Sequence, residues 1–153
     1  MATQTEQPQI VEATGYDQDF YLWCYRMAEL IRVGRFDDVD RENLAEEIES
    51  LGRRYLTELK SRTSSLLVHL LKRDYQPEKR SPSWFKTIDG QRERIAANIE
   101  DNPSLRRMMD DLIYDRYERA VKQTMRETGL RREAFPSTCP YTAIQIYGEW
   151  IVE

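Results

Sequence analysis

The side chains best suited to chemistry lie between positions 58 and 69 of the chain. Glu58, Arg62, Ser65 and His69 are three or four residues apart, so on a helix they occupy successive turns of one face. His69 is the single histidine of the sequence, and an imidazole can act as an acid or a base near neutral pH. The guanidinium of Arg62 can hold a phosphate through two hydrogen bonds. This face therefore predicts Arg62 and His69 as a candidate catalytic pair, with Glu58 beside them.

An arginine followed after six residues by a histidine is also similar to the motif of the helical ribonucleases known as higher-eukaryote-and-prokaryote nucleotide-binding domains. The match is short. His69 is flanked by Val68, Leu70 and Leu71, an environment typical of a half-buried, hydrogen-bonded histidine with a structural role. We favour the structural interpretation, and the exposure of Arg62 and His69 distinguishes the two.

A cluster of carboxylates, with Glu42, Glu46, Glu47 and Glu49, suggests metal binding or proton transfer as an alternative chemistry. Glu49 and Arg53 have the spacing of an ion pair on a helix, which favours a solvated charged face instead. A di-iron site requires glutamate and histidine pairs from two helices, and the chain has one histidine. We therefore expect no metal site and no cofactor.

A second group of polar candidates lies after the connector at residues 81–84. Trp84 begins an apolar stripe that continues through three isoleucines, and Gln91 and Arg92 face nearly the same way. A buried polar pair needs partners. We expect Arg92 to act as an internal clamp on the glutamate cluster, and the candidate binding residues are Trp84, Gln91, Arg92, Glu46 and Glu49.

One long helix over residues 40–76 must position most of these side chains. Asp40 is its expected N-cap, and Pro77 disfavours helical geometry in the residue before it. Gly52 either permits the close approach of another helix or marks a bend. Steps of three, four and seven connect the apolar positions of this helix, which should pack against partner helices: Leu44, Ile48, Leu51, Tyr55, Leu59, Leu66 and Leu70.

Four further helices are expected around it. The first runs over about residues 16–33, with Thr14 or Asp17 as its cap, and Phe36 and Val39 turn inward after it. The third begins at residues 81–84 and the fourth runs from Pro103 to Gly129. A short helix over residues 141–147 follows, with Ile144, Ile146 and Trp150 packing back. The pattern predicts an all-α, four-helix bundle-like single domain over residues 16–153, with one long central helix, a short C-terminal helix and a flexible arm over residues 1–15.

Composition limits the possible partners and the location. The 153 residues are 33% charged and carry a net charge of −4, and residues 79–132 hold 13 basic and nine acidic side chains. This weak positive surplus makes nucleic-acid binding an unlikely function. No apolar run is long enough to cross a membrane, no secretory signal is evident, and Cys24 and Cys139 fit no metal spacing. We expect a soluble cytoplasmic protein with free thiols.

Several short motifs follow one another in a fixed order along the chain: Asp19–Trp23, Glu46–Gly52, His69–Lys72, Tyr75–Pro77, Ser81–Trp84 with Thr87–Ile88 and Gln91–Arg92, Pro103–Leu105, Thr128–Leu130, and Phe135–Pro136 with Cys139–Tyr141. Their order resembles the bacterial family catalogued as domain of unknown function twenty-nine. The resemblance covers residues 16–147 and implies a small all-helical bundle, in a family with no established activity to carry over. Arg73 stands where the family tends to have an aromatic residue.

Two classes of function remain open on these observations. We favour a non-enzymatic binding or regulatory module whose partner is a protein, with a homodimer as one form of it. The alternative is a ribonuclease-like or toxin-type enzyme that uses Arg62 and His69.

Overall fold

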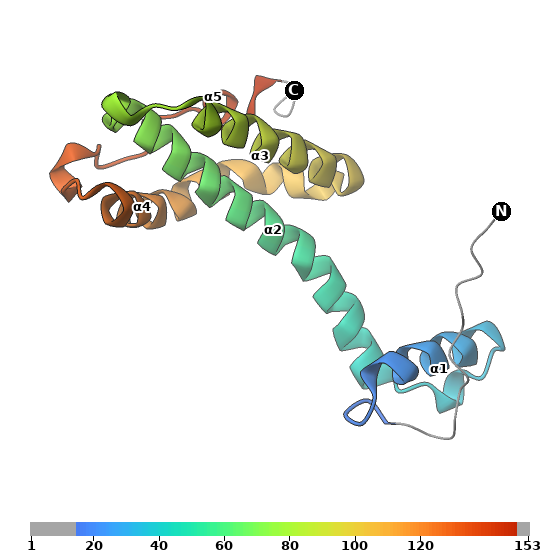
Figure 1. Ribbon diagram of the computed structural model, residues 1–153. Coiled ribbons are helices and arrows are strands. Elements are labelled where there is room, and N and C mark those ends of the chain that lie inside the picture. Colours follow the sequence, from blue (N-terminus) through green and yellow to red (C-terminus); the bar gives the residue numbers. More distant parts are fainter. Residues whose placement is uncertain (1–14, 150–153) are drawn as a thin grey trace. The chain divides into compact units, whose positions relative to one another are not determined.

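The computed structural model describes residues 15–149, and in this range it contains helices and turns and no strand. The all-α class, the long helix and the short C-terminal helix are confirmed (Figure 1). The elements are α1 (Phe20–Arg32), η1 (Phe36–Asp38), α2 (Arg41–Tyr75), η2 (Pro77–Lys79), α3 (Pro82–Asp101), η3 (Pro103–Met108), α4 (Met109–Thr128), η4 (Arg132–Ala134) and α5 (Ala143–Tyr147).

The chain divides into two compact units that meet in sequence between Gly52 and Arg53. We call the described residues 15–52 the first unit and residues 53–149 the second unit; α2 contributes residues to both. The single domain expected over residues 16–153 stays a prediction, and residues 1–14 of the expected arm lie outside the described residues.

The first unit begins α1 four residues later than expected. Gln18 and Asp19 donate their backbone N–H groups to the carbonyl of Gly15, which closes a turn before the helix. Asp19 then caps α1, because its carboxylate accepts from the backbone N–H of Leu22 at 3.0 Å. Asp17 is therefore not the cap, and Thr14 lies outside the described residues.

A small core holds the first unit together. Trp23, Met27 and Leu30 of α1 are buried, and Val39 and Leu44 pack against them. Val39 turns inward as expected, but Phe36 does not: its side chain is 58% exposed. Phe36 is the first residue of η1, whereas Val39 is the extended residue after η1, and of the two only Val39 packs against the core of the first unit.

The expected stripe of α2 is only partly buried. Asp40 caps the helix by accepting from the N–H of Asn43 at 3.3 Å, as predicted. Leu59, Leu66 and Leu70 are buried, whereas Ile48, Leu51 and Tyr55 are 60%, 55% and 44% exposed. The expectation that this whole stripe packs within the chain is therefore wrong at those three positions. A Cβ added at Gly52 meets no atom within 4 Å, so this glycine permits no close approach within the chain.

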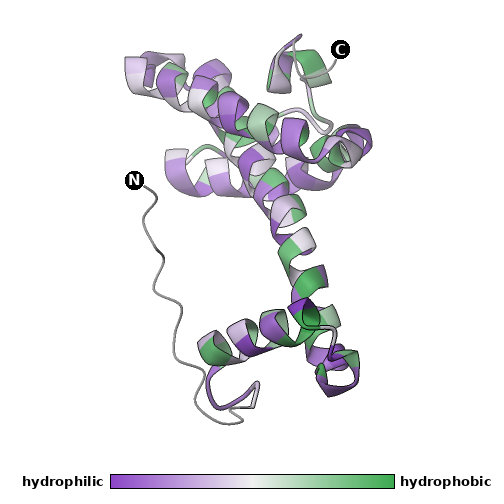
Figure 2. Ribbon diagram, turned by 90° about the vertical axis from the view of Figure 1, so that its right-hand side faces the viewer, coloured by the Kyte–Doolittle hydropathy of each residue, from purple (hydrophilic) through white to green (hydrophobic). Residues whose placement is uncertain are grey.

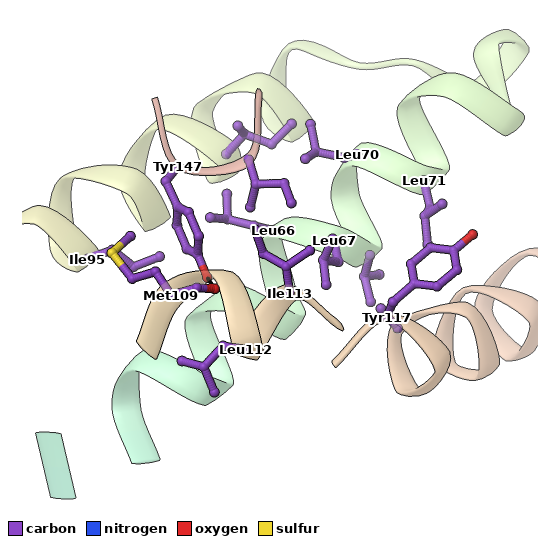
Figure 3. Packing of buried hydrophobic residues seen from close by; sticks show 14 of the residues in the cluster. Leu66, Leu67, Leu70, Leu71, Ile95, Met109, Leu112, Ile113, Tyr117 and Tyr147 are labelled. Atoms are coloured by element: carbon purple, nitrogen blue, oxygen red, sulfur yellow. Dashed lines mark hydrogen bonds between the residues drawn. The ribbon is translucent and has the colours of Figure 1, made fainter. Parts of the chain in front are cut away.

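The core of the second unit is built from four helices. Leu66, Leu67, Leu70 and Leu71 of α2 face side chains of α3, α4 and α5 (Figure 3). Tyr147 of α5 reaches into this core, where its hydroxyl lies 2.9 Å from Thr63 Oγ1 and donates to the carbonyl of Met109 at 3.1 Å. The hydroxyls of Tyr147 and Thr63 therefore both have hydrogen-bond partners inside the core.

Two helix starts in the second unit differ from the expectation. Residues from Pro103 first form η3, and α4 begins only at Met109. Its C-cap is Gly129, where the end of this helix was expected, and the φ of 75° at Gly129 is left-handed. The last helix begins at Ala143 because Thr142 and Gln145 form a reciprocal capping box. Ile146 is buried as expected and Ile144 is 49% exposed, whereas Trp150 lies outside the described residues. None of the helices described over residues 15–149 has the length and apolar content needed to span a membrane.

Candidate functional site

Arg62 lies at the centre of the polar residues on α2. Its Nε and Nη2 atoms lie 2.8 and 2.7 Å from the Glu58 carboxylate, and its Nη1 donates to Oε1 of Gln91 on α3 at 3.0 Å. The Arg62 side chain is 17% exposed. Its guanidinium is therefore neutralised by an acid on its own helix and tied to the next helix by a neutral amide.

A shallow groove lies beside this pair. Its volume is about 300 Å³, and both α2 and α3 contribute to its wall. Two acidic and two basic side chains line it, so it offers no uniform charge to a phosphate or to a metal. The residues that line it are Tyr55, Glu58, Arg62, Arg94, Ala97, Asn98 and Asp101.

His69 is held by the backbone of its own helix. Its Nδ1 lies 2.8 Å from the carbonyl oxygen of Ser65, and because a carbonyl can only accept, Nδ1 carries the proton. The ring is half-buried. Arg62 and His69 are separated by about 10 Å along the helix axis, from seven residues at about 1.5 Å each. The predicted catalytic candidates therefore form two separate hydrogen-bonded pairs, Glu58 with Arg62 and Ser65 with His69.

Arg92 binds the backbone of α5 rather than the glutamate cluster. Its Nε donates to the carbonyl of Ile146 at 2.9 Å and its Nη2 to the carbonyl of Gln145 at 2.5 Å. Burial lowers the pKa of this guanidinium from its usual range, while Asp89 at 3.8 Å opposes that shift. The expected internal clamp exists, but Arg92 donates to backbone carbonyls of α5 and not to carboxylates of the expected glutamate cluster. These carbonyls lie more than fifty positions away in sequence, and no sequence pattern marks a backbone carbonyl as an acceptor.

Trp84 and Gln91 also have partners within the chain. The ammonium of Lys72 lies 5.1 Å from the centre of the Trp84 ring, and Lys72 also forms an ion pair with Glu127 at 2.9 Å. Gln91 accepts from Arg62. These residues join helices of the second unit, and their role as a binding site stays a prediction.

The glutamates of the first unit do not converge on a common point. Glu46 and Glu49 are exposed, whereas Glu47 accepts a hydrogen bond from the Tyr16 hydroxyl at 2.5 Å. This bond raises the pKa of Tyr16 to about 12. In the stretch from residue 15 to residue 149, no three His, Cys, Asp or Glu side chains are grouped so that they could hold a metal.

The structure also reveals a feature that sequence reasoning missed, which we call the first-unit apolar surface. Seven large apolar side chains of the first unit are 43–60% exposed, whereas three are buried. Figure 2 shows the hydrophobic colour on α1 and on the first half of α2. Periodicity marks a face as apolar but does not say whether this chain or another molecule covers it. The surface consists of Phe20, Tyr21, Ile31, Val33, Phe36, Ile48 and Leu51.

Comparison with known proteins places the chain in a family. Neither the curated proteins nor the solved structures contain a significant match. The family model described as "Domain of unknown function DUF29" matches residues 15–151, which is most of the chain and agrees with the resemblance of the short motifs. The chain therefore belongs to the DUF29 family.

Proposed function

We propose that this protein is a non-enzymatic binding module that holds a protein partner through the first-unit apolar surface. The observation that carries the proposal is the imbalance in the first unit, where seven large apolar side chains are exposed and three are buried. Single exposed apolar residues are normal, but a small unit on which seven large apolar side chains are exposed and three are buried is typical of an interaction site.

Energetics support a partner for this unit. Burial of one large apolar side chain stabilises a protein by about 1.5–3 kcal/mol, and ordering one residue of backbone costs about 1–2 kcal/mol. A unit of this length with three buried side chains gains little from its own core. A partner that covers further side chains would stabilise the first unit and bind at the same time.

The hydrogen bonds of the polar side chains in the second unit support a structural role for these side chains. Arg62 is bonded to Glu58 and Gln91, and His69 to a backbone carbonyl. A catalytic arginine or histidine has to exchange such partners for a substrate, at the cost of the bonds it already has. The ribonuclease-like alternative remains a prediction, and no contact of these residues favours it.

We also propose a cytoplasmic location. Its support is chemical: Cys24 and Cys139 are both free thiols and half-buried, a state that a reducing compartment preserves.

The binding proposal is tested by site-specific photo-crosslinking in cells that produce the protein. A photoreactive phenylalanine analogue in place of Tyr21, which is 56% exposed, should form a covalent adduct with a protein. The same analogue in place of Tyr114, 85% exposed on α4, is the matched control and should form none. Phe36→Ser in the Tyr21 background should abolish the adduct. Equal labelling from both positions would contradict the proposal.

The enzyme alternative is tested by RNA cleavage with the purified protein and its His69→Ala variant. We expect no cleavage by either protein and a lower melting temperature for the variant, because the bond to Ser65 is lost. Cleavage that disappears in the variant at an unchanged melting temperature would make His69 catalytic and overturn the proposal.

A further inference from the structure

We propose that α2 pairs with the α2 helix of a second copy of this chain, in antiparallel orientation, through the face that carries Ile48, Leu51 and Tyr55. This inference rests on the proposed binding function and names the partner for the part of the apolar surface that lies on α2.

The face itself is a continuous apolar stripe on one helix. Ile48, Leu51 and Tyr55 are three and four residues apart, so they lie above one another on α2. Each is between 44% and 60% exposed. Leu44, one turn earlier on the same stripe, is half-buried against the core of the first unit. Side chains with this spacing are those that a second helix covers by knobs-into-holes packing.

The spacing of the stripe fits a copy of itself running in the opposite direction. The steps from Leu44 through Ile48 and Leu51 to Tyr55 are four, three and four residues, which read the same in both directions. An antiparallel copy therefore sets Ile48 opposite Leu51 and Leu44 opposite Tyr55. Every apolar side chain of the stripe then meets an apolar side chain, and the contact is the same on both copies, as in a two-fold dimer.

Charge selects the antiparallel orientation over the parallel one. Residues 42–49 carry four glutamates and no base, whereas residues 53–62 carry four bases and one glutamate. Antiparallel pairing sets the acidic half of each helix beside the basic half of the other, and parallel pairing sets like charges together. The same asymmetry extends beyond α2: residues 1–52 hold 12 acidic and four basic side chains, and residues 53–153 hold 15 acidic and 19 basic ones. A helix that is complementary to itself in both apolar spacing and charge points to a second copy rather than to an unrelated protein.

Sedimentation equilibrium on the full chain is the first test. The wild type should form a dimer that dissociates at micromolar concentrations and weakens as salt is added. Leu51→Glu should weaken the dimer at least about tenfold, because it places a carboxylate in the apolar seam. Tyr114→Glu, an equally severe change at an exposed residue of α4, is the control and should leave the dimer unchanged. Circular dichroism identifies any variant that fails to fold, in which case Ile48→Ser replaces Leu51→Glu.

Disulfide trapping tests the register and the orientation. Cys24→Ser and Cys139→Ser first remove the two native thiols. When Ile48→Cys and Leu51→Cys proteins are then mixed and oxidised, antiparallel pairing predicts mixed disulfides in excess over disulfides between identical chains. An excess of disulfides between identical chains would overturn the antiparallel arrangement.

The dimer and the binding function can fail separately. A chain that stays monomeric at about 100 μM, or a dimer that Leu51→Glu and Tyr114→Glu weaken equally, would overturn the α2 dimer. If the adduct from position 21 persisted in that case, the binding proposal would stand without it. If the adduct from position 21 were a second copy of this chain, α1 would join the same dimer and the inference would be strengthened.

Discussion

Arg62 and Gln91 join α2 to α3 through one hydrogen bond, from Nη1 to Oε1 over 3.0 Å. The rest of the guanidinium faces Glu58 on its own helix, so the charge of Arg62 is balanced where the two helices meet. Arg62, which the sequence suggests for phosphate binding, thus already has hydrogen-bond partners on two sides of its guanidinium. Its partners identify it as a link between helices.

Removal of Gln91 tests this link. Gln91→Ala should destabilise the fold by about 1 kcal/mol, because it removes one hydrogen bond at a partly buried position. Arg62→Ala should cost more than Gln91→Ala, because it also removes the ion pair with Glu58. The double variant should cost less than the sum of the two, by about 0.5–1 kcal/mol. Urea denaturation measures all three values, and Glu93→Ala, at an exposed position of α3, is the control. Strict additivity would mean that the bond contributes nothing to stability.

The buried hydroxyl of Tyr147 provides a second prediction. Tyr147→Phe removes the donor to the Met109 carbonyl and the partner of Thr63, and all three groups lie inside the core of the second unit. We expect a loss of about 1–3 kcal/mol, because buried polar groups are left without partners. Tyr114→Phe, at the 85% exposed tyrosine of α4, should change stability by less than about 0.5 kcal/mol. Equal effects of the two variants in thermal denaturation would contradict the buried network.

Two glycines should respond with opposite signs to the same change. Gly52 lies within α2 and a Cβ added there meets nothing within 4 Å, so Gly52→Ala should stabilise by about 0.5–1 kcal/mol. Gly129 has equal space around an added Cβ but a φ of 75°, so Gly129→Ala should destabilise by about 1 kcal/mol. Chemical denaturation of both variants separates backbone conformation from crowding. A loss of stability at Gly52 would show that α2 is not helical at this point.

Periodicity predicted the helices of this chain because each amphipathic stripe follows from local spacing. Gly129 predicted the end of one helix and the connector at residues 81–84 predicted the start of another, since the effect of these residues on the backbone is local. Contacts between residues that are distant in sequence were harder to predict. The partners of Arg92 are backbone carbonyls, which every residue carries, so the sequence could not single out those of Gln145 and Ile146. The stripe of α2 was recognised, but its exposed middle was not, because spacing does not reveal whether the covering helix belongs to the same molecule.

The last prediction concerns acid stability at the C-terminal end of α2. Arg73 donates to both carboxylate oxygens of Asp74, at 2.7 and 3.0 Å, and the hydroxyl of Tyr141 donates to Oδ2 at 3.0 Å. The Arg73 bonds and the Tyr141 bond hold the pKa of Asp74 below its usual value of 3.8, although partial burial opposes them. Because the folded pKa is the lower one, the ionised carboxylate stabilises the fold fully above pH 3.8, and this contribution is lost as the pH falls through the folded value.

Tyr141→Phe should reduce that acid-dependent loss, because one of the bonds that lower the Asp74 pKa is gone. Asp74→Asn should remove the contribution of this carboxyl altogether, so its stability should fall less steeply between about pH 5 and pH 2 than that of the wild type. Glu127, whose pKa is also lowered, by Gln123 and Lys72, should account for part of the remaining slope, and Glu127→Gln measures it separately. Urea denaturation at several pH values gives each slope. An unchanged slope in Asp74→Asn would show that Asp74 titrates alike in the folded and unfolded chains, and that the bond to Tyr141, 67 residues away in sequence, does not persist in solution.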